Sequence, residues 1–275
     1  MNALNVTVVG QLGDVIEDLN SRSDVSTIVL EGAGKAFVAG ADVKFFVDKI
    51  EEDSFSDIED FTKDGHRVLG LIEGSPHTTI ALTTGLALGG GLELALSCDY
   101  RIGTEKTMLR FPETSIGIYP GLGGTQRATR VCGIEAARFA VLAGNFMDAG
   151  AASALGLITH LVDASEVSRT VREVSSAGKP QDKYPGSPSD PSHPVAAMSK
   201  AFFSDSNMEA LLSGQVPEGF DPEDRNVARQ LKSLSRAAPV SVRIASDLLD
   251  KALVTDLESG LQLELDALEE IFATQ

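Results

Sequence analysis

Three consecutive glycines, Gly89, Gly90 and Gly91, lie between a strand pattern at residues 78–83 and an apolar helix pattern at residues 91–97. Because glycine has no Cβ, backbone amides in such a run can approach a ligand closely. The helix start adds unpaired N–H groups and partial positive charge, which suit an anion or a developing oxyanion. A tight turn with close helix–strand packing explains the glycines equally well. A Walker loop is excluded, because no Lys-Ser or Lys-Thr follows, and a dinucleotide fingerprint needs a different glycine spacing.

Strand and helix patterns alternate along the first part of the sequence. Apolar residues at helical spacing indicate amphipathic helices, and short β-branched runs bounded by turn residues indicate buried strands. This alternation predicts an α/β architecture. The expected helices are residues 7–20, 57–72 and 91–97, and the expected strands are residues 26–30, 78–83 and 100–102.

The composition changes at residues 177–194, where prolines recur with Gly and Ser between them. Such a segment is unsuited to regular structure, and we interpret it as a surface excursion or linker. Helical patterns return afterwards, at residues 223–235, 239–253 and 257–272. The sequence therefore predicts three parts: a core at 1–174, a Pro- and Gly-rich insertion at 175–222, and a helical region at 223–275.

The formal net charge of −17 at pH 7 argues against nucleic acid or an anionic membrane as the main partner, because both require clustered Lys and Arg. The longest apolar stretch, residues 79–97, is interrupted by glycines and contains Glu93, so we expect no membrane span. Cys98 and Cys132 are too few for a disulfide framework or a multi-cysteine zinc site. Reduced thiols and the absence of a basic and apolar leader favour a cytoplasmic protein.

Two glutamates have apolar surroundings that are unusual for a carboxylate. Glu93 lies one turn into a helix that is apolar nearly all round, and such a helix is normally buried. Buried glutamates of raised pKa are typical of general acid–base catalysis, although a bond to an Arg or to backbone amides would also explain Glu93. Glu113 is the single acid of a glycine- and proline-punctuated segment at 111–125, where it could instead cap a turn. Together the two acids favour a catalytic pair.

A third segment of small residues follows the strand at 26–30. Residues 34–41 again leave backbone amides accessible, and Asp42 is expected to be the N-cap of a helix that begins at Val43.

These segments together resemble the crotonase (enoyl-CoA hydratase/isomerase) superfamily. The residues that carry the resemblance are Phe37-Val38-Ala39-Gly40-Ala41-Asp42, Ala87-Leu88-Gly89-Gly90-Gly91-Leu92-Glu93, Ser97-Cys98-Asp99, Pro112-Glu113 and residues 117–127. The resemblance covers residues 2–162 without a break and returns in the final helix, at 259–274. Several motifs in the right order and spacing make it far more specific than one glycine run.

The resemblance implies a spiral of repeated ββα turns, with C-terminal helices that build a homotrimer or a dimer of trimers. It also implies an oxyanion hole, made by the amides of Ala41 and Gly90, that binds the thioester carbonyl of an acyl-CoA substrate. Such a donor typically contributes a hundred- to a thousandfold in rate. Ala39 would offer its carbonyl to the adenine of coenzyme A, and Lys44 would lie near its phosphates.

The acids distinguish subfamilies, and both acids typical of the hydratases are present in this sequence. In the implied mechanism Glu93 and Glu113 bind one water. Glu93 helps to deprotonate it as it attacks C3, and Glu113 delivers a proton to C2 of the enolate, which gives a 3-hydroxyacyl-CoA. Gly121 would lie beside the water. No metal and no cofactor are expected, because coenzyme A is part of the substrate.

Other functions stay open on the sequence alone. Within the superfamily they are isomerisation of an enoyl-CoA, which usually needs the Pro-Glu acid alone, and hydrolysis of a 3-hydroxyacyl-CoA. A scaffold or RNA-binding relative is disfavoured by the charge of −17 and by the two retained acids. A nucleotide-dependent oxidoreductase is disfavoured by the glycine spacing.

Three features depart from the family pattern. Arg110 and Phe111 precede Pro112 where hydratases often have smaller or amide residues, which affects the expected acyl pocket. The segment from about residue 175 to 221 is longer than in a compact hydratase. Both ends of the sequence differ from the family's usual limits, so we hypothesise a module of a longer polypeptide, fused to a 3-hydroxyacyl-CoA dehydrogenase.

Overall fold

A computed structural model describes residues 2–273, and within them the strands form two four-stranded sheets. The strands are β1 (Thr27–Glu31), β2 (Ala36–Val38), β3 (Thr78–Thr83), β4 (Leu86–Leu88), β5 (Tyr100–Gly103), β6 (Met108–Arg110), β7 (Met147–Asp148) and β8 (His160–Leu161). One sheet has the order β1-β3-β5-β8, and the other has the order β2-β4-β6-β7. All neighbours are parallel except β6 and β7.

The chain winds through these sheets as a spiral. Each of the first three turns adds one strand to each sheet, in the pairs β1/β2, β3/β4 and β5/β6, and then forms helix before it returns. All six residues of β3 are buried, as expected for a central strand of a parallel sheet that is covered on both faces. This arrangement confirms the predicted α/β class with a spiral of ββα turns.

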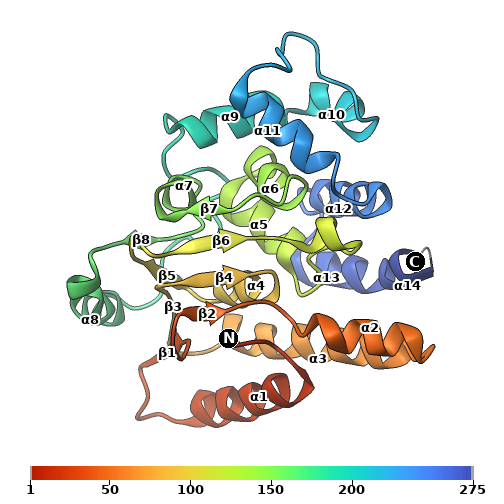
Figure 1. Ribbon diagram of the computed structural model, residues 1–275. Coiled ribbons are helices and arrows are strands. Elements are labelled where there is room, and N and C mark those ends of the chain that lie inside the picture. Colours follow the sequence, from red (N-terminus) through yellow and green to blue (C-terminus); the bar gives the residue numbers. More distant parts are fainter. Residues whose placement is uncertain (1, 274–275) are drawn as a thin grey trace.

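Helices surround the strands and dominate the C-terminal part (Figure 1). The first group comprises α1 (Val6–Ser21), α2 (Val43–Glu51), α3 (Phe55–Glu73), α4 (Gly90–Ser97), η1 (Glu113–Ile116), α5 (Gly124–Cys132), α6 (Ile134–Val141), α7 (Ala149–Ala154), η2 (Ala164–Glu166) and α8 (Val167–Ala177). The second group comprises α9 (Pro194–Phe202), α10 (Asp205–Leu212), α11 (Arg225–Leu234), α12 (Pro239–Lys251), α13 (Leu257–Asp266) and α14 (Leu268–Ala273). Every helix and strand expected from periodicity is present, within a few residues of its predicted bounds, except that the last helix is divided.

The second sheet was missed by the pattern analysis. We expected a glycine-rich turn directly after Thr83, whereas the structure inserts β4 before Gly89. With three residues each, β2, β4 and β6 are too short to display a periodicity of two. The Asp42 N-cap is confirmed, since its carboxylate accepts the Lys44 amide at 3.1 Å.

The Pro- and Gly-rich segment is irregular only in its first half. Residues 178–193 form no helix or strand, as predicted, but they are fastened to the core. Lys183 Nζ donates to the Ser97 carbonyl at 2.6 Å, and the Tyr184 hydroxyl bonds Glu73. The following residues form α9 and α10, which the sequence analysis did not predict. Their helices are stabilised by tertiary packing, because Phe202 at the end of α9 is fully buried.

The last predicted helix is divided in two. The sequence indicated one helix over 257–272, whereas α13 ends at Asp266 and α14 begins at Leu268. The Tyr119 hydroxyl donates to the backbone carbonyl of Glu264, the group that would otherwise accept the next turn's amide. Thr274, which the family resemblance included in this helix, lies outside the described residues.

Cys98 and Cys132 are both buried and free, which confirms that they form no disulfide with each other. Among residues 2–273, no helix has the length and apolar character needed to cross a membrane. Trimer formation stays a prediction.

Candidate active site

An apolar cavity of about 170 Å³ lies among the first helices of the spiral and the last helix of the chain. Its polar lining comes from the three sequence motifs (the segment at 39–41, the glycines at the start of α4 with Glu93, and the stretch from Pro112 to Leu122) and from Thr62 of α3. Its apolar walls come from α2, α3, the η1 region and α14. These apolar residues are Val43, Phe46, Val47, Ile50, Phe61, Ile116, Ile118, Leu268, Ile271 and Phe272.

Glu93 reaches this cavity from the first turn of α4, and its side chain is buried, with 2% of the residue exposed. Its Oε1 accepts the backbone amides of Leu122 and Gly124, each at 2.7 Å. Burial raises the pKa of Glu93 well above its usual value, and the charges of Glu113 and Glu264 raise it further. Glu93 is therefore hydrogen-bonded to backbone amides, which was the structural explanation of this residue. It also lines the cavity, which a catalytic acid must do.

Glu113 opens η1 and is 7% exposed. Its Oε2 is buried and has no hydrogen-bond partner among the described residues. Burial raises the pKa of Glu113 to about 8. Gly89 makes room for this carboxylate, because a Cβ there would lie 2.2 Å from Glu113 Oε1. Glu113 makes no side-chain capping bond in η1, so the alternative role as a cap is not supported.

The two acids therefore meet at one cavity, as the sequence predicted. The largest cause of the raised pKa is the same for both glutamates, namely burial away from solvent. When one of them is ionised, its negative charge disfavours ionisation of the other. Near neutral pH, such a pair can therefore consist of one protonated carboxyl group and one ionised carboxylate. One carboxylate that accepts a proton beside one carboxyl that donates it is what general acid–base chemistry needs.

Two backbone amides lie beside the acids. Leu4 pairs with Ala41 in an isolated parallel β-bridge. The Leu4 amide donates to the Gly40 carbonyl, and the Leu4 carbonyl accepts the Asp42 amide. The Ala41 amide is therefore left without an acceptor among the described residues. Gly90 is the first residue of α4, so its amide has no partner within the helix. A Cβ at Gly90 would lie 3.6 Å from the Ala41 nitrogen, which shows how close these residues are. Both line the cavity.

Gly90 and Gly91 of the glycine run have different surroundings, and the binding of an oxyanion by the run stays a prediction. Gly90 lies at the cavity, whereas a Cβ at Gly91 would lie 2.2 Å from the Val38 carbonyl oxygen and 2.7 Å from its Cβ. The latter glycine therefore permits close packing of α4 on β2.

The remaining predicted residues divide into two groups. Ala39 and Gly121 line the cavity. Lys44 does not, since its ammonium group is exposed and lies 3.4 Å from Asp48. Its contact with a CoA phosphate stays a prediction, as does the adenine contact of Ala39. Arg110 and Phe111 turn away from the cavity: Arg110 Nε donates to the Gly144 carbonyl at 2.6 Å, and Phe111 is fully buried in the core.

Comparison with known proteins agrees with this arrangement. A family model described as enoyl-CoA hydratase/isomerase matches residues 1–275. This chain belongs to the enoyl-CoA hydratase/isomerase family. YngF of Bacillus subtilis, which carries the hydratase/isomerase name, is 30% identical over the whole chain and 83% of its own length. The short-chain-enoyl-CoA hydratase of Clostridium acetobutylicum is 35% identical over 64% of this chain and 66% of its own length.

Solved structures show the same fold. An enoyl-CoA hydratase from Rhodobacter sphaeroides superposes with a TM-score of 0.80 over 97% of this chain and 77% of its own, at 21% identity. A carnitinyl-CoA dehydratase from Mycobacterium thermoresistibile also gives a TM-score of 0.80, over 98% of this chain and 79% of its own, at 18% identity. The crotonase fold that the sequence resemblance implied is thereby confirmed.

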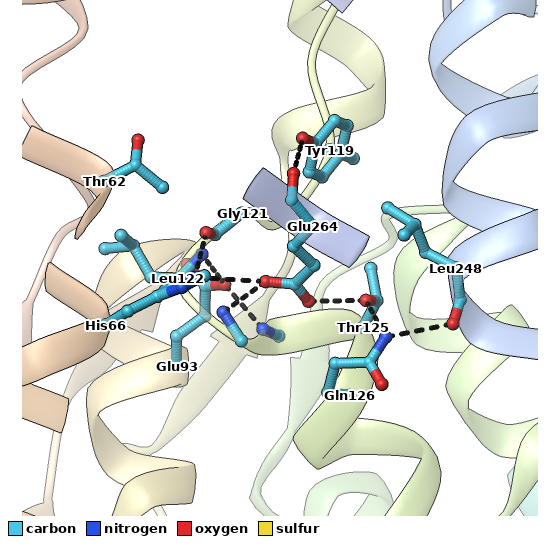
Figure 2. A network of polar contacts seen from close by, with 12 residues as sticks. Thr62, His66, Glu93, Tyr119, Gly121, Leu122, Thr125, Gln126, Leu248 and Glu264 are labelled. Atoms are coloured by element: carbon cyan, nitrogen blue, oxygen red, sulfur yellow. Dashed lines mark hydrogen bonds and ion pairs between the residues drawn. The ribbon is translucent and has the colours of Figure 1, made fainter. Parts of the chain in front are cut away.

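Two polar residues near the site of this hydratase/isomerase family member were missed by the sequence analysis (Figure 2). Glu264 of α13 is fully buried and accepts the Gly123 amide at 2.7 Å. His66 of α3 places its Nε2 2.7 Å from the Gly121 carbonyl oxygen. In the sequence, Glu264 is one more polar residue of an amphipathic helix. The one local signal is Gly260 one turn earlier, which allows that face of α13 to approach a neighbour closely.

No group of three or more His, Cys, Asp or Glu side chains within the described residues is arranged to hold a metal ion. The expectation that catalysis needs no metal and no further cofactor stays a prediction.

The free energy of unfolding should fall as the pH rises from about 5 to about 7. With a pKa of about 8, Glu113 in the folded chain keeps a proton that the unfolded chain releases, so the folded state loses stability with rising pH. We expect wild type to lose on the order of 2 kcal/mol more than Glu113→Gln over this range. Urea unfolding at several pH values measures the difference, and parallel curves for the two proteins would contradict the raised pKa.

Proposed function

We propose that this protein adds water across the C2–C3 double bond of a 2-enoyl-CoA and releases a 3-hydroxyacyl-CoA. The observation that carries the proposal is a single apolar cavity lined by two buried glutamates of raised pKa and by two residues, Ala41 and Gly90, whose backbone amides have no acceptor within residues 2–273. The names of the similar hydratases support the same reaction.

In this mechanism the amides of Ala41 and Gly90 bind the thioester carbonyl oxygen. They stabilise the negative charge that develops there when a nucleophile adds to C3. Glu93, as the carboxylate, takes a proton from the water that attacks C3. Glu113, as the carboxylic acid, gives a proton to C2. The electron pair of the enolate forms the new C–H bond, the thioester carbonyl is restored, and Glu113 is left as a carboxylate. The proton that Glu93 took from the water then restores the acid form of Glu113 through solvent, before the next turnover. Gly121 lies at the cavity wall, where it would stand beside the attacking water.

Isomerisation of an enoyl-CoA is the second candidate, and one observation favours it. Glu93 Oε1 already accepts two backbone amides, whereas Glu113 Oε2 has no hydrogen-bond partner in the part of the chain that the structure describes. Glu113 could therefore move a proton between C2 and C4 by itself, with Glu93 holding the adjacent loop.

Three substrates separate the candidates, with the conjugated enoyl absorbance and the release of free thiol as the two readouts. A hydratase removes the absorbance of crotonyl-CoA and forms 3-hydroxybutyryl-CoA. An isomerase leaves crotonyl-CoA intact and creates the absorbance from a 3-enoyl-CoA. A hydrolase releases free thiol from 3-hydroxybutyryl-CoA, which a thiol reagent detects. An intact crotonyl-CoA signal together with activity on either other substrate would overturn the proposed hydration.

The acyl chain would lie against the aromatic side chains at the end of the cavity. Phe46 of α2 and Phe272 of α14 stack with ring centroids 6.5 Å apart, and both line the cavity. Coenzyme A would extend from the thioester past Ala39.

The match to the fatty acid oxidation complex subunit alpha of Shewanella halifaxensis, 35% identical over 96% of this chain and 35% of that subunit, supports the hypothesis of a longer polypeptide. Fusion to a dehydrogenase, trimer or hexamer assembly and a cytoplasmic location are part of the same proposal.

A further inference from the structure

The segment at residues 121–124, here called the 121–124 loop, lies between two carboxylates. The amides of Leu122 and Gly124 donate to Glu93 Oε1, each at 2.7 Å. The amide of Gly123, which lies between them in the chain, donates instead to Glu264 Oε2 at 2.7 Å (Figure 2). Because successive amides point in different directions, the loop is held from the side of α4 and from the side of α13. Its shape therefore depends on both acids.

Glu264 is surrounded by donors. Its Oε1 accepts the Thr125 hydroxyl at 2.5 Å, and its Oε2 lies 3.4 Å from His66 Nε2. Among the described residues, no Arg or Lys lies within ion-pair distance of this carboxylate, and His66 is the nearest basic side chain. An ionised carboxylate only accepts hydrogen bonds, so this set of donors suits the ionised form. A buried charge of this kind is costly unless it is hydrogen-bonded, and here the Gly123 amide and the Thr125 hydroxyl supply the bonds.

His66 connects the same carboxylate to the other end of the loop. Its Nε2 lies 2.7 Å from the Gly121 carbonyl oxygen. Since a carbonyl can only accept, that nitrogen carries the hydrogen. The side chain is buried on α3, with 8% exposed. It thus fixes the peptide of Gly121, a residue at the cavity wall, with respect to α3 and α13.

The network continues into α12. Gln126 Nε2 donates to the Thr125 hydroxyl oxygen and to the Leu248 carbonyl, both at 3.0 Å. A Cβ at Gly260 would lie 2.0 Å from Gln126 Oε1, so α13 packs closely on α5. The C-terminal helices are in this way joined to the loop that holds Glu93.

We propose that Glu264 and His66 are positioning residues, which hold the 121–124 loop and thereby present Glu93 to the substrate in the orientation that hydration requires. This inference rests on the proposed function. Neither residue lines the cavity, so both act through the loop and not on the substrate. The charge of Glu264 has a second effect: after burial and the charge of Glu113, it is the next cause of the raised pKa of Glu93.

A change in the pKa of Glu93, seen in the pH profile of kcat, therefore reports the loss of the Glu264 charge when the other charged groups stay in place. Those facing the network are Glu73 and His66 of α3, Glu113 of η1, Tyr119 before α5, and Arg127 and Arg130 of α5. Arg127 is paired with Glu73 at 2.9 Å, and Arg130 donates to the Thr255 carbonyl at 2.7 Å. In the helices packed on α13, the residues Arg243, Asp247, Asp250, Glu269 and Glu270 are exposed.

The test is Glu264→Gln in the whole chain, assayed with crotonyl-CoA across a range of pH. Glutamine keeps the shape and one acceptor but removes the negative charge. We expect kcat to fall about tenfold, with KM changed less than about twofold, because ground-state binding does not use this residue. Removing a negative charge lowers the pKa of Glu93, so the limb of the kcat profile that reports Glu93 should move about one unit to lower pH.

Two further variants separate charge from position. Glu264→Asp keeps the charge but shortens the side chain, so it should lower kcat and leave the limb in place. Glu258→Gln changes an exposed acid on the same helix and should alter neither quantity. If Glu264→Gln does not fold, His66→Leu decides the matter, since loss of the donor to Gly121 should lower kcat by a similar factor.

Hydrogen–deuterium exchange of a peptide that contains residues 121–124 gives a readout that needs no activity. Exchange should be faster in both variants than in wild type. Glu264→Gln replaces the charged acceptor of the Gly123 amide by a neutral and weaker one, and His66→Leu removes the donor to the Gly121 carbonyl. An inactive wild type would refute the proposed hydration, while this exchange difference would still test the network. A folded Glu264→Gln with an unmoved pH limb and unchanged exchange would overturn the positioning role.

Discussion

Replacing either Glu93 or Glu113 by glutamine is expected to lower kcat/KM for crotonyl-CoA by about 10²- to 10⁴-fold. In Glu93→Gln the new amide oxygen can still accept the Leu122 and Gly124 amides, so the loop is retained and only the proton-accepting group is lost. In Glu113→Gln an amide that cannot deliver a proton to carbon replaces the buried carboxyl group, whose Oε2 has no partner among residues 2–273. Steady-state kinetics on the purified variants measures both effects.

The pattern of losses distinguishes two-acid from one-acid chemistry. If the acids act on one water as a unit, the double variant should be about as slow as the slower single variant. Glu105→Gln, which changes an exposed acid between β5 and β6, is the matched control and should retain wild-type rates. A Glu93→Gln variant that hydrates normally would contradict the proposed mechanism and favour the single-acid isomerase.

Gly91→Ala is expected to destabilise the folded chain by about 3 kcal/mol. Its Cβ would lie 2.2 Å from the Val38 carbonyl oxygen and 2.7 Å from the Val38 Cβ, so either α4 or β2 would have to shift. Neither atom is the end of a flexible side chain that could turn aside. The midpoint of urea unfolding, compared at one protein concentration, measures the change.

Gly70→Ala is the matched control for this substitution, because it adds the same methyl group to another helical glycine. Gly70 is exposed on α3, and a Cβ there would meet nothing within 4 Å. Alanine should stabilise this variant by about 0.5–1 kcal/mol, since glycine is the poorer helix former. Similar unfolding midpoints for the two variants would refute the close contact between α4 and β2.

Three of the four strands in one sheet could be predicted from local pattern, whereas the two-residue strand β8 of that sheet and the strands of the other sheet could not. β1, β3 and β5 are four to six residues long and rich in β-branched or apolar side chains, so their sequences indicate strands. β2, β4 and β6 have three residues each and acquire their extended form through pairing with one another. Their existence depends on partners far apart in the sequence.

The candidate site divides in the same way. Glu93 and Glu113 could be identified because each is a lone acid among apolar residues and glycines, a combination that ordinary surface positions do not show. Glu264 and His66 could not, because each lies on an amphipathic helix that offers many polar positions. Only the docking of α13 and α3 against the 121–124 loop shows that these two side chains are buried.

The order of the motifs in the chain carried the resemblance that identified the family and implied the ββα spiral. The sequence also singled out Glu93 and Glu113, because a lone acid among apolar residues and glycines is visible within a short segment. The tertiary structure decided which amides lie at the cavity and where the last helix is divided. It also decided that a third acid, Glu264, binds the same loop as Glu93. The physical reason is that burial and hydrogen bonding between segments far apart in the sequence set these features. Glu264 lies 171 positions after Glu93 in the sequence, and yet the two carboxylates hold neighbouring amides of one loop.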